Sequence, residues 1–160
     1  MTCPDTPLPT AQFQTMAAAT MGLDAAWDRA IANYLAADIK MRAQEVYGPL
    51  ARQKDDDTLE AWAMEARHGR NWRSSAEGAD VAAQHRRNLV TYDDRMRAEF
   101  YEPQWQALRD VVRTPAPSFP AVAWKAALID WEDLWSDNLL EGDCFAILEA
   151  DLARLAGGDQ

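Results

Sequence analysis

The chain has 160 residues, a length that favours one domain with a core of ordinary size and excludes two large domains. Hydrophobic residues make up 48% of the sequence and charged residues 26%, which is enough apolar side chain to exclude wholesale disorder. Ala, Leu, Arg, Glu and Met are plentiful while Val, Ile and Thr are few, so the composition predicts an all-α protein.

The formal net charge is −10, and the excess of acid is concentrated near the C-terminal end. Residues 114–160 hold nine acidic and two basic side chains. A surface of that sign repels nucleic acid and anionic lipid and attracts basic proteins. Solubility alone also explains the imbalance, so the charge by itself leaves both interpretations open.

Two cysteines, Cys3 in a proline-rich segment and Cys144 in an apolar helical pattern, indicate no disulfide framework. The first nine residues lack a basic region followed by an apolar run, and no stretch approaches 18 uncharged apolar residues. We therefore expect a soluble cytoplasmic protein without a membrane segment.

The N-terminal part of the chain divides into an arm and a helix. Residues 1–20 contain three prolines and then small residues without a clear period, which predicts a flexible arm. We expect residues 21–160 to form a single helical domain. Over residues 24–46 apolar side chains recur at steps of three and four, which predicts a helix that Gly48 and Pro49 bring to an end.

The middle of the chain is more polar. Residues 48–57 include three consecutive aspartates and predict a solvated loop. A short helix is expected to follow, because Asp57 and Glu60 have the spacing of a capping box. Residues 69–78 predict a second loop, so this short helix would lie in a mobile middle segment. Its apolar side chains share one face: Leu59, Trp62 and Ala66.

Three further segments follow the middle. Residues 79–100 predict a long helix, and Pro103 predicts a kink or a fresh helix. Residues 114–120 contain three prolines and predict an extended turn, with Ser118 as the N-cap of the next helix. That helix is expected to place two stripes on opposite sides: Trp124, Leu128, Trp131 and Trp135 on one, and Asp130, Asp133 and Asp137 on the other.

A last helix is expected from about Asn138 or Asp143 to the glycines at 157 and 158. The links between the main helices are short or marked by proline. The sequence therefore predicts a helical bundle of about four main helices, plus the short helix of the middle segment. The side chains expected to face inward from the last helix are Leu140, Cys144, Ile147, Leu148, Leu152 and Leu155.

The sequence offers little support for catalysis or for a cofactor. Glu65 and His68 have the Glu-x-x-His spacing of metal-binding bundles, but His85 has Ala82 where the second glutamate would stand. No glycine-rich phosphate loop is present, and no serine or cysteine is paired with a base by spacing. We therefore expect a protein that is not an enzyme and holds neither metal nor cofactor.

Basic and aromatic residues gather in the middle segment, where they can contact phosphate or another protein. Twelve acidic residues share residues 51–113 with them, so we regard nucleic acid as an improbable partner and pairing with the acidic helices as the better explanation. An exposed tryptophan here would be an interface anchor. The candidate exposed aromatic or basic contacts are Trp62, Arg67, Arg70, Trp72 and Arg73.

The run PAPSFPAVAWKAALIDWEDLW, followed by AILEADLARLAGG, resembles a group of uncharacterised small helical proteins of alphaproteobacteria, often encoded among prophage or mobile-element genes. The resemblance covers about 45 residues and contains no catalytic motif. It implies a helical pair joined by a proline-rich turn and a mobile-element origin, and it assigns no function.

These observations lead to a first hypothesis, a noncatalytic acidic interaction protein that binds a basic surface of another protein. In its sharper form it is a mobile-element-encoded inhibitor, whose carboxylates occupy a nucleic-acid-binding groove where phosphates would lie. The expected partner-binding residues are Asp130, Asp133, Asp137, Glu141 and Glu149.

The alternative hypothesis is a structural or assembly component of a phage-like particle, which would form a homo-oligomer through exposed tryptophans. It predicts self-association that does not depend on salt. Direct nucleic-acid binding through the basic middle segment, or enzymatic activity, is a third and weaker interpretation.

Overall fold

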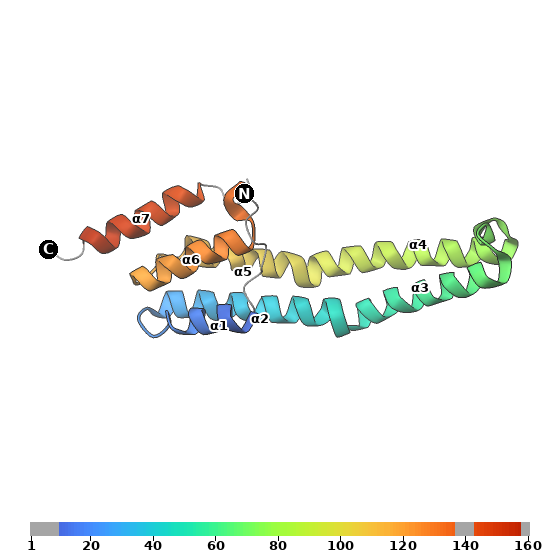
Figure 1. Cartoon of the computed structure of the whole chain (residues 1–160), viewed down its shortest axis with the longest axis horizontal. Coiled ribbons are helices and arrows are strands. Elements are labelled where there is room, and N and C mark those ends of the chain that lie inside the picture. The colour runs from blue at the N-terminus through green and yellow to red at the C-terminus, as the bar shows by residue number, and fades with distance from the viewer. Residues whose placement is uncertain (1–9, 137–142, 158–160) are drawn as a thin grey trace, which may run out of the picture. The chain divides into compact units, whose positions relative to one another are not determined.

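The computed structural model describes residues 10–136 and 143–157, and every regular element in these ranges is helical (Figure 1). The prediction of an all-α protein is confirmed. No helix in the described ranges is both long and apolar enough to cross a membrane. The chain forms two compact units: unit 1 comprises Met1–Ala36 and Gln106–Gln160, and unit 2 comprises Ala37–Trp105. A single domain over residues 21–160 stays a prediction. One bundle of about four helices stays a prediction.

The helices follow one another with short connections. The α-helices are α1 (Thr10–Ala18), α2 (Ala25–Tyr47), α3 (Pro49–His68), α4 (Ala76–Met96), α5 (Glu102–Arg113), α6 (Phe119–Trp131) and α7 (Cys144–Gly157). The shorter elements are the 3-10 turns η1 (Trp72–Ser74) and η3 (Leu134–Ser136) and the π-helical turn η2 (Arg97–Tyr101).

In unit 1, the described part of the expected flexible arm is helical. Phe13 on α1 is buried, and its ring centroid lies 5.1 Å from that of Trp124 on α6. The Trp124 indole N–H also donates to the Phe13 carbonyl at 3.4 Å. This aromatic anchor fixes α1, so the prediction of a flexible arm is wrong for residues 10–18. Residues 1–9 lie outside the described residues.

Helix α2 agrees with the predicted helix over residues 24–46. The Asp24 side chain caps its N-terminus by accepting from the amides of Ala26 and Trp27 at 2.8 and 2.9 Å. Trp27 and Ile31 are buried at the predicted spacing. The Trp27 ring meets the Trp124 ring edge to face, with centroids 5.9 Å apart.

Helix α6 begins as predicted, with the Ser118 hydroxyl accepting from the Ala121 amide at 3.4 Å. It ends at Trp131, because Asp133 takes a left-handed φ of 52°, a conformation that short polar side chains tolerate where helices end. Trp135 therefore lies in η3 and is 38% exposed. The expected continuous tryptophan stripe is wrong beyond Trp131.

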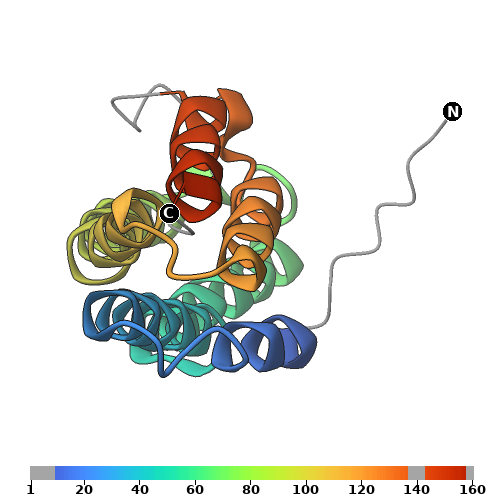
Figure 2. The same cartoon turned by 90° about the vertical axis from the view of Figure 1, so that its left-hand side faces the viewer.

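Helix α7 packs along α6 in unit 1 (Figure 2). Cys144 is buried as predicted, but Leu152 is 43% exposed and Asp151 is buried instead. The predicted inward face is thus wrong in part, and Leu140 lies outside the described residues. Asp151 is buried because it pairs with Lys125 on α6.

Lys125 and Asp151 form a buried ion pair, with Nζ and Oδ2 2.5 Å apart and side chains 0% and 6% exposed. Lys125 Nζ also donates to the Thr114 carbonyl at 2.7 Å, and Asp151 Oδ1 accepts from the Ala116 amide at 3.1 Å. Burial lowers the pKa of Lys125, and its bond to Asp151 opposes that shift. The pair fixes α7 to the turn that precedes α6.

Unit 2 contains the largest departure from the sequence expectations. Helix α3 runs unbroken over residues 49–68, so the predicted loop at residues 48–57 and the separate short helix are both wrong. Gly48 is extended, and Pro49 takes the first helical position, where its missing N–H costs nothing. Proline here separates α2 from α3 and also starts α3.

The second predicted loop, residues 69–78, is short and well anchored. The buried Trp72 lies in η1, where the Ser75 hydroxyl donates to the Trp72 carbonyl at 2.8 Å and accepts from the Gly78 amide at 3.0 Å. Ser75 is thereby the N-cap of α4, and Gly78 already belongs to its first turn. A side chain at Gly78 would collide with the Trp72 carbonyl, so only glycine fits.

The predicted kink or fresh helix near Pro103 takes the form of a π-helical turn, through which the helical backbone continues without a break. Helix α5 begins at Glu102, after the π-helical turn η2, in which the Glu102 amide donates to the Arg97 carbonyl. Pro103 has no amide hydrogen for the Glu99 carbonyl, and Lys40 Nζ lies 3.5 Å from that carbonyl oxygen. The expected turn at residues 114–120 is also present, over 114–118.

Candidate functional site

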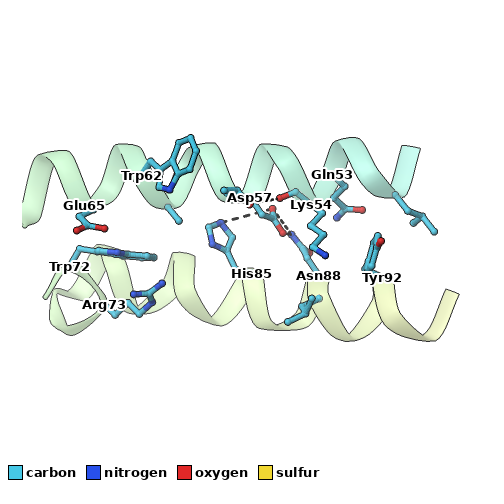
Figure 3. A pocket seen from close by; sticks show the side chains of 14 residues that line it. Gln53, Lys54, Asp57, Trp62, Glu65, Trp72, Arg73, His85, Asn88 and Tyr92 are labelled. Carbon is cyan, nitrogen blue, oxygen red and sulfur yellow. Dashed lines mark hydrogen bonds and ion pairs between the residues drawn. The ribbon is translucent and has the colours of Figure 1, made fainter. Parts of the chain in front are cut away.

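A groove of about 400 Å³ runs between α3 and α4 within unit 2 (Figure 3). Its lining mixes aromatic, apolar and charged side chains, which is the usual character of a ligand or peptide site. The groove is partly open to solvent. The residues that line it and bear on its chemistry are Lys54, Asp57, Trp62, Glu65, Trp72, Arg73, His85, Asn88, Leu89 and Tyr92.

Asp57 of α3 and His85 of α4 line this groove, and Glu60 of α3 contacts His85 beside it. Asp57 and Glu60 are three residues apart and so lie on one side of α3. His85 Nε2 lies 2.8 Å from Glu60 Oε2 and 3.9 Å from Asp57 Oδ1. The side chains of His85, Asp57 and Glu60 are 17%, 23% and 54% exposed, so the cluster is half-buried on the α4 side and open on the other.

Neighbouring side chains hold this cluster in place. Asn88 lies one turn beyond His85 and donates through Nδ2 to both carboxylate oxygens of Asp57, at 3.0 Å each. The buried Trp72 ring meets the His85 ring edge to face, with centroids 6.5 Å apart. Thr58, the hydroxyl-bearing residue next to Asp57, donates to the Lys54 carbonyl at 2.8 Å, so its hydroxyl is not directed at His85 as a nucleophile would be.

Two aromatic rings of the groove are covered by cations of the same unit. Lys54 Nζ lies 5.0 Å from the centroid of Tyr92, and the Arg73 guanidinium carbon lies 4.4 Å from that of Trp72. Both distances are typical of cation–π contacts. Among the described residues, no cation lies over the ring of Trp62.

The apolar face that α3 carries at the rim of the groove is exposed. Trp62 is 65% exposed and Leu59 58% exposed, and Ala66 on the same face is exposed as well. Figure 3 shows the Trp62 indole projecting from α3 on the side away from α4. We call Leu59, Trp62 and Ala66 the α3 stripe. It is an apolar helix face that the described chain does not cover.

The basic and aromatic candidates of the middle segment differ in their exposure. Trp62 is exposed as the sequence hypothesis required, but Trp72 is 2% exposed and belongs to the core of unit 2, so its expected role as an exposed contact is wrong. Arg70 and Arg73 are exposed. Arg67 lies 3.4 Å from Glu77, a partner in its own unit and not in the acidic C-terminal helices.

The expected C-terminal carboxylates do not lie on one helix. Asp130 is exposed near the end of α6 and accepts from the Trp135 indole N–H at 3.1 Å. Asp133 is exposed in the turn that follows, and Glu149 is exposed on α7. Asp137 and Glu141 lie outside the described residues. The expectation that one helix carries the three aspartates opposite the tryptophans is therefore wrong.

The sequence pattern missed the convergence at His85. The Glu65–His68 pair that its spacing singled out does not form, because His68 Nε2 lies 3.3 Å from Glu77 Oε2. The sequence shows the spacing of Asp57 and Glu60. At the start of a helix this spacing indicates a capping box, whereas inside α3 it places both carboxylates on one side of the helix. Only the register of α3 against α4 brings these carboxylates to His85.

No protein-family model, curated protein or solved structure matches this chain.

Proposed function

We propose that the protein is a noncatalytic interaction protein whose α3 stripe binds a basic, amphipathic segment of another protein. The observation that carries this proposal is the exposure of Trp62, 65%, beside the exposed Leu59. Folding normally buries much of a tryptophan because of its large apolar surface, and tryptophan is one of the residues enriched among interface hot spots. A partner that covered the α3 stripe would remove this surface from water.

The charges beside Leu59 and Trp62 favour a basic partner, whereas the cations Arg67 and Arg70 lie at the Ala66 end of the α3 stripe. Asp55 and Asp56 lie one turn before Leu59, Glu65 lies one turn after Trp62, and all three carboxylates are exposed. An arginine or lysine that stacked on the Trp62 ring would stand within reach of Glu65. The rings of Tyr92 and Trp72 in the same groove already hold such cations from within unit 2.

The net charge of −10 adds a long-range contribution to this recognition. An acidic protein attracts basic partners and accelerates their encounter, and the effect weakens as salt rises. The exposed Asp130, Asp133 and Glu149 add to this field. Their direct contact with a partner, the inhibitor form of the hypothesis and the alternative of a self-assembling phage component stay predictions.

The proposal is tested with the full chain and a library of synthetic helical peptides that vary in charge and in the spacing of apolar residues. Peptides with Arg or Lys beside an apolar i, i+3, i+4 pattern should be selected, because a helix that covers a helix contacts it with that spacing. Acidic peptides should not be selected.

The decisive variants are Trp62→Ala and, as a matched control, Tyr47→Ala. Tyr47 is 73% exposed on α2 of the same unit and does not line the groove. Truncating a hot-spot tryptophan weakens binding by about 2 kcal/mol or more, which is about thirtyfold. Unchanged peptide affinity in Trp62→Ala, or an equal loss in Tyr47→Ala, would exclude the α3 stripe as the binding surface.

A further inference from the structure

Three side chains with metal-ligand atoms converge between α3 and α4. One ligand atom from each of Asp57, Glu60 and His85 lies within 4.8 Å of the other two. The ligands come from two helices and combine one imidazole with two carboxylates, so the cluster differs from an ordinary acidic patch. From this geometry we propose that Asp57, Glu60 and His85 bind a divalent transition metal ion, with Zn²⁺ as the best fit.

The distances suit a tetrahedral ion. Zinc binds imidazole nitrogen and carboxylate oxygen at about 2.0–2.2 Å, so two ligand atoms of a tetrahedral site stand about 3.3–3.5 Å apart. The distances from His85 Nε2 are 2.8 Å to Glu60 and 3.9 Å to Asp57, on either side of that value. Formation of a tetrahedral site would lengthen the first distance and shorten the second by about 0.5 Å each.

The charge and the donor types also fit zinc. Two carboxylates and a neutral imidazole carry a charge of −2, which a divalent ion neutralises. Imidazole nitrogen with carboxylate oxygen suits zinc, whereas Mg²⁺ and Ca²⁺ prefer oxygen alone. The open side of the cluster, where Glu60 is 54% exposed, leaves room for water or a partner side chain as the fourth ligand.

Neighbouring side chains orient the proposed ligands, as they do in known metal sites. Asn88 holds both oxygens of Asp57 at 3.0 Å, and the buried Trp72 lies edge to face with His85. The Lys54 ammonium, the nearest cation along α3, is directed over the Tyr92 ring. This arrangement separates the positive charge of Lys54 from the three ligands.

The competing explanation is a plain hydrogen-bonded or ionic contact between His85 and Glu60. The chain contains a matched example of that kind, because His68 lies 3.3 Å from the single carboxylate of Glu77. These are the only two histidines in the sequence. Each imidazole can therefore be assigned and compared within one molecule, and the inference does not depend on the proposed partner binding.

The test uses the full chain, freed of metal with EDTA and titrated with ZnCl₂. Calorimetry should give one ion per chain, and imidazole ¹H–¹⁵N spectra should show the His85 signals shifting while those of His68 stay in place. At a hundredfold excess over the dissociation constant, the thermal midpoint should rise by about 5–10 °C.

Variants separate this site from adventitious binding. His85→Gln should weaken zinc binding about tenfold or more, and Asn88→Ala, which removes only the support of Asp57, should also weaken it about tenfold. His68→Gln is the control and should bind as the wild type does. If His85→Gln fails to fold, Glu60→Gln replaces it as the test, because it changes a half-exposed side chain and should also weaken zinc binding. Equal zinc affinity in His85→Gln and His68→Gln, or equal shifts of both imidazoles, overturns the proposal.

Discussion

The buried pair of Lys125 and Asp151 makes a quantitative prediction about the stability of unit 1. Both side chains are almost fully removed from water, at 0% and 6% exposure. Removing one member of a buried pair strands the other charge, which typically costs about 3–5 kcal/mol. The two possible deletions are not equivalent, because the partners left behind differ.

Asp151→Asn leaves the Lys125 ammonium with the Thr114 carbonyl at 2.7 Å and no carboxylate. We expect a loss of about 3–5 kcal/mol in the free energy of unfolding. Lys125→Met leaves Asp151 with the Ala116 amide at 3.1 Å and the Arg154 guanidinium at 3.4 Å. Its loss should be smaller, about 1–3 kcal/mol, because the carboxylate keeps partners and methionine fills the space.

The Asp151→Asn deficit should shrink as pH rises toward 10.5, the ordinary pKa of lysine. Burial lowers the pKa of Lys125 in the folded state, so the folded protein is penalised while this lysine must stay charged. At high pH the folded protein releases that proton more readily than the unfolded chain, and the penalty fades.

The assay is urea unfolding followed by circular dichroism, with amide hydrogen exchange to locate the loss in unit 1. Arg29→Met is the control, because Arg29 is exposed on α2 within unit 1 and its loss should cost less than about 1 kcal/mol. A loss below about 1 kcal/mol in Asp151→Asn, or a larger loss in Lys125→Met, would refute the reasoning.

Three further predictions concern single positions. Gly78→Ala should cost about 1–3 kcal/mol in urea unfolding, because its Cβ would lie 1.8 Å from a backbone oxygen of η1, whereas Gly157→Ala has open space and should change stability by less than about 1 kcal/mol. Ser118→Ala should cost about 1 kcal/mol by the same assay, through loss of the α6 cap. Burial first, and then its bond to Glu45, raise the pKa of Tyr101 to about 12, so the stability it contributes is complete below about pH 10 and lost as pH rises toward 12. An ultraviolet titration should show a late-titrating phenol that is lost in Tyr101→Phe and whose pKa stays raised in Glu45→Gln, because burial remains.

The helices with a strong apolar period could be predicted from the sequence. Trp27 and Ile31 in α2 are buried at the predicted spacing, and Ser118 caps α6 as expected. Both signals are local, since a helix face and an N-cap are decided within one or two turns. The end of α6 was missed because the left-handed conformation of Asp133 has no comparable signature.

Helix α3 could not be recognised over its first half, because little of it is buried. The residues it buries are Leu50, Ala51 and Met64, so its remaining polar residues have the composition of a solvated loop. High intrinsic helix propensity can keep such a segment helical even where it has no apolar stripe. The proline at its first position gave the same signal as a helix end, and proline is compatible with both.

The charged groups of the two units show the limit of local patterns. Asp57 and Glu60 contact His85 on another helix, and Asp151 pairs with Lys125 on another helix. Neither contact follows from spacing within one element. One signal was available. Lys125 stands in an apolar helix between tryptophan and alanine, and a lysine buried there requires an acidic partner.

The central claim is that the protein binds its partner through the α3 stripe. Its most direct test is hydrogen exchange of the full chain with and without a selected basic peptide, in the wild type and in Trp62→Ala. We predict that the peptide slows exchange in α3 and α4 and that Trp62→Ala abolishes this protection. Protection of α6 and α7 instead, or protection that survives Trp62→Ala, would contradict the claim.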